Sequence, residues 1–405
     1  MMQQLAFGAV FGVTMQAGVF FLAMVSPSLT ALVFGESLQY ALLPKLLNAV
    51  DVNARVHAIR SALNRSMLLI GAAAIFSGAW GMIVGGDRFA WGEYFCYSAL
   101  FLVSHLLSMW AATVLVSLQA VGILVKPTFV HLIPVPIICI VALMTSSLTC
   151  VAVSFVVAAL VQVLALLLFF RCAGHVWTSA LKRLSISDFM QSVTLQDFRV
   201  LVVAASLPII SAVDRYAQTF NDVADTAAVS YAWAITLGIA NVLARGPNFV
   251  LSVYLHSEQP SQGRLSNKVA SYVATLFLSA GIAGYLMLIV FRIFGAGAIP
   301  IAHQSTWMSI EPFLIPQLLT LSVLTVIPSL YRIVARLYGT DAAARIAILQ
   351  VSVHLAVVTV LCAADKQGLI RYSASMVLVT IFGVLIYRTI AAGRLTEPGM
   401  GSKGV

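Results

Sequence analysis

Long apolar runs recur along the whole chain, and short polar segments separate them. Each run holds about 20 residues, which is enough to cross a bilayer as a helix, so the pattern predicts about twelve membrane helices. The boundary between the first two depends only on Pro27 and the Gly35-Glu36 pair, so this stretch is expected to form two spans or one and a half. The expected ranges are residues 5–26, 27–47, 64–85, 95–124, 128–146, 149–171, 200–220, 227–254, 270–295, 312–336, 343–363 and 370–392.

The composition indicates a membrane protein. Of the 405 residues, 61% are hydrophobic and only 9% are charged, whereas a soluble domain has roughly 25% charged residues. A transmembrane barrel would show alternating segments of about 10 residues, and the sequence has no such pattern. The prediction is therefore an all-α, polytopic transmembrane helical bundle. No Lys or Arg precedes Lys45, so the basic region of a cleavable signal peptide is missing and we expect the first helix to be retained.

Charged residues alternate between successive loops. Because cytoplasmic loops are enriched in Lys and Arg, the basic loops and the C-terminus are predicted to face the cytoplasm. The net charge of +9 then reflects orientation beside anionic lipid headgroups, and no basic stripe with interleaved aromatic residues indicates nucleic-acid binding. The basic set contains Arg55, Arg60, Arg65, Lys126, Lys182, Arg183, Arg199, Arg264, Lys268, Arg336, Arg345, Arg394 and Lys403. Few or no cations occur in residues 87–93, 145–149, 221–226, 295–311 and 364–371.

The longest polar connection, residues 171–199, lies near the middle of the chain. The simplest organisation is a pair of helical lobes around a central cavity, which is an architecture of alternating-access transporters. A single bundle with one long loop is the alternative. The expected parts are an N-terminal lobe at residues 1–171, a cytoplasmic linker at 172–199, a C-terminal lobe at 200–393 and a cytoplasmic tail at 394–405.

Three charged residues, Asp214, Arg215 and Arg245, interrupt apolar segments of the second half. A charge at the bilayer centre costs roughly 2.5–3.5 kcal/mol on insertion scales, so such residues usually face a bundle interior or a wet cavity. Asp214 and Arg215 project about 100° apart on a helix and need not pair with each other. Either Arg215 binds a phosphate while Asp214 serves orientation or ion coupling, or Asp214 forms a structural ion pair and Arg215 reaches the membrane interface.

Arg245 directly precedes Gly246 and Pro247. An unwound turn beside a buried cation would make a good anion site, and we expect Arg245 to line the cavity. Glu36 is the only carboxylate in the apolar interior of the first lobe. It is expected either to line the cavity or to lie near a helix end.

The sequence carries no signature of catalysis or of a metal site. The seven histidines include no H-x-x-x-H or H-E-x-x-H pair, and the five cysteines include no C-x-x-C spacing. No nucleophile elbow, P-loop or glycine-rich dinucleotide turn occurs. We therefore expect no catalytic residue, no metal, no cofactor and no enzymatic activity.

Several motifs occur in an order that is found in a known family. The pair Phe20-Phe21 is followed by Pro27 and then by the run ESLQYALLP at residues 36–44. In the second half, Val213-Asp214-Arg215 precedes Val229-Ser230-Tyr231-Ala232, and residues 323–348 contain the run RIVARLYGTDAAARIA. These features resemble the MurJ/MviN family of lipid II flippases, in its early helices, its seventh and eighth helices and its tenth-to-eleventh helix connection.

The chain differs from this family in several places. From the resemblance we expect the chain to begin within the family's first helix and to end after about the twelfth, without the usual last two. Ala31-Leu32 occupies the place of a basic pair, and Trp233-Ala234 occupies the place where Asp-Arg often occurs. Arg245 lies roughly three turns further along the same helix and is placed to supply a replacement cation.

The resemblance implies a transporter of the multidrug/oligosaccharidyl-lipid/polysaccharide exporter superfamily, whose members flip amphiphiles by alternating access of two lobes. The implied substrate is a polyprenyl-pyrophosphate-linked glycan, such as lipid II or an exopolysaccharide precursor, in the bacterial inner membrane. Arg245 and Arg215 would contact the pyrophosphate, and membrane lipid and a coupling ion would be further partners of a monomer. The alternatives are a drug or cation antiporter of the same fold, for which Glu36 and Asp214 are the available carboxylates, and a non-transporting homologue.

Overall fold

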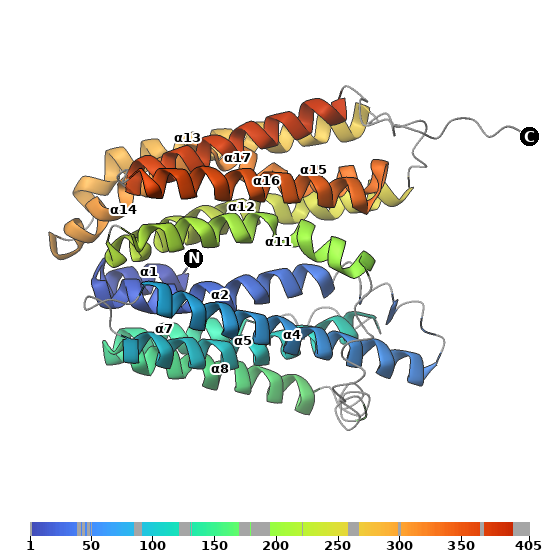
Figure 1. The fold of residues 1–405 in the computed structure, drawn as a ribbon, viewed down its shortest axis with the longest axis horizontal. Coiled ribbons are helices and arrows are strands. Elements are labelled where there is room, and N and C mark those ends of the chain that lie inside the picture. The colour runs from blue at the N-terminus through green and yellow to red at the C-terminus, as the bar shows by residue number, and fades with distance from the viewer. Residues whose placement is uncertain are drawn as a thin grey trace, which may run out of the picture. The chain divides into compact units, whose positions relative to one another are not determined.

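The computed structural model describes residues 2–38, 42, 45, 46, 49, 51–84, 91–120, 130, 132–169, 179, 195–220, 222–257, 267–298, 301–364 and 368–391. Over these residues the chain is helical, with no strand (Figure 1). Its helices are α1 (Met2–Phe11), α2 (Met15–Ser37), α4 (Val52–Val84), α5 (Trp91–Ala120), α7 (Pro134–Thr145), α8 (Leu148–Phe169), α11 (Leu195–Gln218), α12 (Val223–Ser257), α13 (Asn267–Ala298), α14 (Ile301–Leu319), α15 (Leu321–Tyr338), α16 (Thr340–Ala363) and α17 (Gly368–Ala391). Within this described part, 10 helices are long and apolar enough to cross a membrane. The predicted all-α, multi-pass architecture is confirmed.

The first apolar stretch does not break at Pro27, as the sequence suggested. Pro27 lies inside α2, and the chain breaks earlier, where Gly12 has a φ of 61°. The side chain of Thr14 then caps α2 by accepting the N–H of Ala17 at 3.2 Å. A proline removes one backbone donor, which a membrane bundle tolerates. A glycine in the left-handed region followed by a capping threonine is therefore the stronger helix boundary.

Helix α4 begins at Val52, about three turns before the predicted start near residue 64. Hydropathy marks only the apolar part of a helix, whereas the backbone here remains helical through polar residues. The 33 residues of α4 extend about 50 Å, which exceeds the hydrocarbon thickness of ~30 Å. The cations that the sequence assigned to a loop, Arg55, Arg60 and Arg65, therefore lie on this helix.

Packing divides the chain into two compact units, Met1–Tyr231 and Ala232–Val405, which we call unit 1 and unit 2. The division falls inside α12, so the first turns of that helix belong to unit 1. The lobe boundaries proposed around the linker at residues 172–199 stay a prediction, because most of that linker lies outside the described residues.

Helix α2 forms the core of unit 1, where it packs against α4, α5 and α11. Its aromatic rings interlock with those of neighbouring helices: the ring centroid of Phe20 lies 5.0 Å from that of Phe101 on α5. Polar contacts join the same helices. His105 Nδ1 lies 2.8 Å from the carbonyl oxygen of Phe101 and donates to it, so Nε2 is left to accept from the hydroxyl of Ser28 at 3.2 Å.

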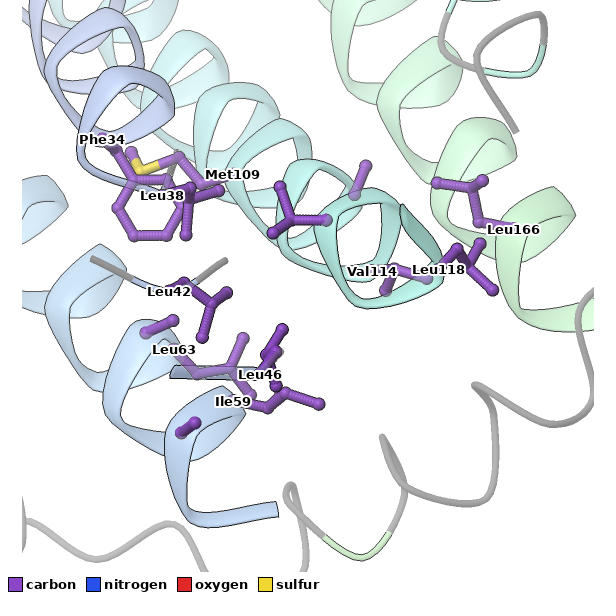
Figure 2. Close-up of a cluster of buried hydrophobic side chains, with 14 of the residues drawn as sticks. Phe34, Leu38, Leu42, Leu46, Ile59, Leu63, Met109, Val114, Leu118 and Leu166 are labelled. Atoms are coloured by element: carbon purple, nitrogen blue, oxygen red, sulfur yellow. The ribbon is translucent and has the colours of Figure 1, made fainter. Parts of the chain in front are cut away.

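A second apolar cluster lies toward the end of α2 and joins it to α4 and α5 (Figure 2). Its side chains are all hydrocarbon or thioether groups. Their burial therefore removes no hydrogen-bonding side chain from water. The cluster contains Phe34, Leu38, Leu42, Leu46, Ala58, Ile59, Ala62, Leu63, Met109, Ala111, Val114, Val116, Leu118, Val163 and Leu166. We call it the α2–α4 cluster.

Helix α15 has the central position in unit 2, where it packs against α13, α16 and α17. Helix α14 covers Ile301–Leu319, although the sequence suggested a loop over residues 295–311. As in α4, the backbone stays helical through polar residues, which hydropathy alone does not mark as helix. It carries Gln317, which is fully buried.

Gln317 connects three helices of unit 2 through its amide. Its Oε1 accepts from the hydroxyl of Thr236 on α12 at 2.7 Å, and its Nε2 donates to the hydroxyl of Tyr372 on α17. All three side chains are buried. Buried polar groups of this kind fix helix register, because each would be costly without its partner.

We expect Gln317→Leu to lower the free energy of unfolding by about 1–3 kcal/mol, because buried hydroxyls lose their amide partner. The double variant with Thr236→Val should cost less than the sum of the two single changes, since it removes both ends of one bond. Thermal unfolding of the purified protein in detergent measures all three variants. If the double variant lost as much unfolding free energy as the two single variants together, the hydrogen bond between Gln317 and Thr236 would be contradicted.

Candidate functional site

A small hollow opens in unit 1 between the end of α2 and the first half of α4. Its cavity volume is about 10 Å³, which is room for about one water molecule. Its apolar wall belongs to the α2–α4 cluster, whose members Phe34, Leu38 and Leu42 can be followed in Figure 2. The described residues that line it are Phe34, Leu38, Leu42, Lys45, Ala58, Ser61, Ala62 and Arg65.

Arg65 anchors the polar wall of this hollow. It is only 8% exposed, and its Nη2 donates to Ser61 Oγ at 3.4 Å, one turn earlier on α4. Lys45 lines the same hollow and is exposed. The two cations offer charge-assisted donors to an anionic group, because ammonium and guanidinium groups bind carboxylate and phosphate oxygens strongly. The hollow therefore places two cations beside an apolar wall.

Asp214 lies on α11 and is 2% exposed. Ser211 and Gln218, three residues before and four after it, are also buried. The three share one face of α11, and α11 packs against α2. Arg215, the next residue, is half-buried in the last turn of α11, as expected for neighbours about 100° apart on a helix. The structure thus groups Asp214 with two neutral polar side chains, and neither Asp214 nor Arg215 lines the hollow.

The other two predicted site residues have a described backbone only. Arg245 lies on α12, which continues as a helix through Gly246 and Pro247. The unwound turn predicted there is therefore wrong, because a membrane helix can absorb one proline without unwinding. Glu36 lies at the end of α2, in its last turn. The side chains of Glu36 and Arg245 fall outside the described residues, so their roles in a cavity stay predictions.

Sequence reasoning did not identify Lys45 and Arg65 as site residues. Arg65 was assigned to a cytoplasmic loop with Arg55 and Arg60, on charge pattern alone. The sequence did contain an indication that Arg65 is buried, because the apolar run of α4 follows it directly and Ser61 lies one turn before it. A cation at the apolar end of a basic segment is more buried than the cations before it.

Comparison of folds relates the chain to one group of membrane proteins. The inward closed conformation of the lipid II flippase MurJ is similar with a TM-score of 0.72 and 15% identity, over 96% of this chain and 87% of that one. An inward-facing multidrug resistance MATE family transporter of the MOP superfamily follows with a TM-score of 0.64 and 12% identity, over 98% and 95%. A MOP superfamily transporter from Pyrococcus furiosus has a TM-score of 0.56 and 11% identity, over 98% and 92%.

No protein-family model and no curated protein matches the sequence. At these identities the similarity establishes the fold alone, which the chain shares with these transporters. It does not separate flippases from multidrug transporters, since both have this fold.

Proposed function

We propose that the chain is a flippase that moves a lipid-linked sugar across the bacterial inner membrane by alternating access, in peptidoglycan biosynthesis or polysaccharide export. The observation that carries this proposal is the hollow in which Lys45 and Arg65 adjoin the α2–α4 cluster. The similarity to the lipid II flippase MurJ supports it at the level of the fold. The substrate would be a polyprenyl-pyrophosphate glycan.

The chemistry of such a substrate fits the two walls of the hollow. A sugar-pyrophosphate headgroup cannot enter hydrocarbon unaided, because its polar groups would lose their hydrogen bonds to water. Lys45 and Arg65 would hold phosphate oxygens, and Phe34 and Leu38 would contact the first isoprenoid units. A space of about one water molecule accepts only one oxygen-sized group, so a whole headgroup would enter in a wider state of the cycle.

The remaining charges would act later in the same cycle. Arg215 and Arg245 would contact the pyrophosphate as it moves, and Asp214 would orient it or bind a coupling ion. Glu36 would line the route near the end of α2. In this proposal the C-terminus is cytoplasmic, as the loop charges predict, and the protein works as a monomer with membrane lipid around it.

The test of this route is flipping of a fluorescent polyprenyl-pyrophosphate sugar in proteoliposomes. We expect Arg245→Gln and Arg215→Gln each to slow flipping by about tenfold or more, because each removes a charge-assisted contact worth roughly 1.5–3 kcal/mol. Arg388→Gln is the matched control, since Arg388 is exposed on α17, and it should flip normally. Unchanged rates in both test variants would remove these two residues from the route.

A drug or cation antiporter of the same fold is the second candidate, and one observation favours it. Asp214 is a buried carboxylate with Ser211 and Gln218 on the same face of α11. A membrane carboxylate that faces polar groups is suited to bind a cation or a proton. In that case Asp214→Asn should abolish export of a cationic dye, whereas Arg65 should matter little.

A further inference from the structure

Arg371 is a buried cation in unit 2. It is the fourth residue of α17 and is only 2% exposed. Its Nη1 donates to the sulfur of Cys362, in the last turn of α16, at 3.0 Å. A guanidinium stays charged in proteins, and a buried charge is costly unless it is paired. The sulfur of Cys362 is the partner of one of the three guanidinium nitrogens.

The other two guanidinium nitrogens of Arg371 have no hydrogen-bond partner in the structure. Both Nε and Nη2 are buried. These nitrogens form one edge of the planar group, and their N–H bonds point in nearly the same direction. That edge is the fork that binds two oxygen atoms of a carboxylate or a phosphate at once. The geometry leaves the bidentate edge without a hydrogen-bond partner and uses only the third nitrogen.

The start of α17 adds positive potential near this edge, and the side-chain contacts that the described residues make here involve no carboxylate. α17 begins at Gly368, so Arg371 lies in the first turn, where backbone N–H groups have no acceptor within the helix and the helix dipole is positive. One turn further on, Ser375 Oγ lies 3.2 Å from His354 Nε2 on α16. Cys362, Ser375 and His354 thus contribute a sulfur atom, a hydroxyl and an imidazole to this end of α16 and α17.

The position along the helix indicates which anion is available. The apolar span of α17 runs from Gly368 to Arg388, so Arg371 lies about 5 Å along the helix axis from its start. This is near the depth of lipid phosphates, since ~20 residues cross the hydrocarbon core. Leu369 and Ile370, the two residues before Arg371, are exposed, with 40% and 49% of their surface accessible, as for side chains that face lipid.

The geometry points to an anion site in unit 2, in which the Nε and Nη2 edge of Arg371 binds a phosphate-type oxyanion between the end of α16 and the start of α17. The oxyanion comes from a phospholipid headgroup or from free phosphate. The site does not depend on the proposed substrate, because it lies in another unit from the hollow of Lys45 and Arg65.

The test uses the full chain, stripped of lipid in a neutral maltoside detergent, and follows its melting temperature. One series adds sodium phosphate against sodium chloride at equal ionic strength. The other adds dioctanoyl phosphatidylglycerol against dioctanoylglycerol, which has no phosphate. The variants are R371Q, R371K and the exposed control R388Q. R371K keeps the charge and loses the fork.

For the wild type, we expect phosphate, phosphatidylglycerol or both to raise the melting temperature by several degrees, since a ligand at about 100 times its Kd shifts the folding equilibrium by about 100-fold. A response to both identifies a site open to solvent, and a response to the lipid alone identifies the headgroup as the source. R388Q should respond like the wild type, R371K should need about tenfold more ligand, and R371Q should not respond.

A wild type that responds to neither probe would overturn the site, whatever the variants do. So would an equal response to chloride, or an R371Q response equal to that of the wild type. R371Q without ligand should melt no lower than the wild type without ligand, because it removes a buried charge for which no counter-ion occurs among the described residues.

Discussion

Replacing Gly18 with alanine is expected to destabilise the protein by about 2 kcal/mol. A Cβ atom on Gly18 would lie 1.9 Å from the carbonyl oxygen of Val223, because α2 passes directly against the start of α12 within unit 1. The atom that blocks it belongs to the backbone and cannot rotate away. Alanine gains about 1 kcal/mol of helix propensity over glycine, but forced overpacking costs roughly 3 kcal/mol. The clash therefore outweighs the gain.

The control for this change lies on the same helix. Nothing lies within 4 Å of a Cβ built on Gly35, so Gly35→Ala should be neutral or stabilising by up to about 1 kcal/mol. Thermal unfolding in detergent measures both variants. Equal melting temperatures for the two would show that α2 and α12 do not approach as closely as described.

Neutralising Arg65 and Lys45 together is expected to slow flipping of a lipid-linked sugar by about a hundredfold, at about tenfold per charge-assisted contact. Gln at position 65 can still hydrogen-bond to Ser61, so the fold should persist. The measurement is the initial rate in proteoliposomes, with the melting temperature recorded for each variant.

Arg55→Gln is the matched control for that prediction. Arg55 lies on α4 as Arg65 does, but it does not line the hollow. Its replacement should leave the rate within about a factor of two, since surface charge changes have small effects. If Arg55→Gln slowed flipping as much as the double variant, the effect would come from the general basic charge of α4 and not from the hollow.

The fold was predictable from sequence because its main signal is repetitive. Apolar runs of membrane length mark most of the helices, and insertion into a bilayer leaves few alternatives to a helix. The predicted helix boundaries were wrong where a helix continues through polar residues or through a proline. α4 continues through Arg55 and Arg60, and α2 continues through Pro27, because hydropathy reports burial in lipid and not hydrogen bonding along the chain.

The site was less predictable, for a different reason. Asp214 could be found from sequence because a carboxylate in an apolar segment is rare, and it is indeed buried. Arg65 and Arg371 are also buried, yet both lie close to polar segments, where a cation usually meets water. Burial near a helix end depends on which neighbouring helix covers the side chain, and that is a tertiary property without a local signal.

The proposed flippase moves an anionic amphiphile and not a cation. The most direct measurement loads proteoliposomes with both a fluorescent polyprenyl-pyrophosphate sugar and a cationic dye, and compares the wild type with Arg65→Gln and Asp214→Asn. We expect the wild type to flip the sugar lipid, Arg65→Gln to flip it about tenfold more slowly, and the dye not to move. Export of the dye that is lost in Asp214→Asn, with no flipping of the sugar lipid, would contradict the account and identify an antiporter.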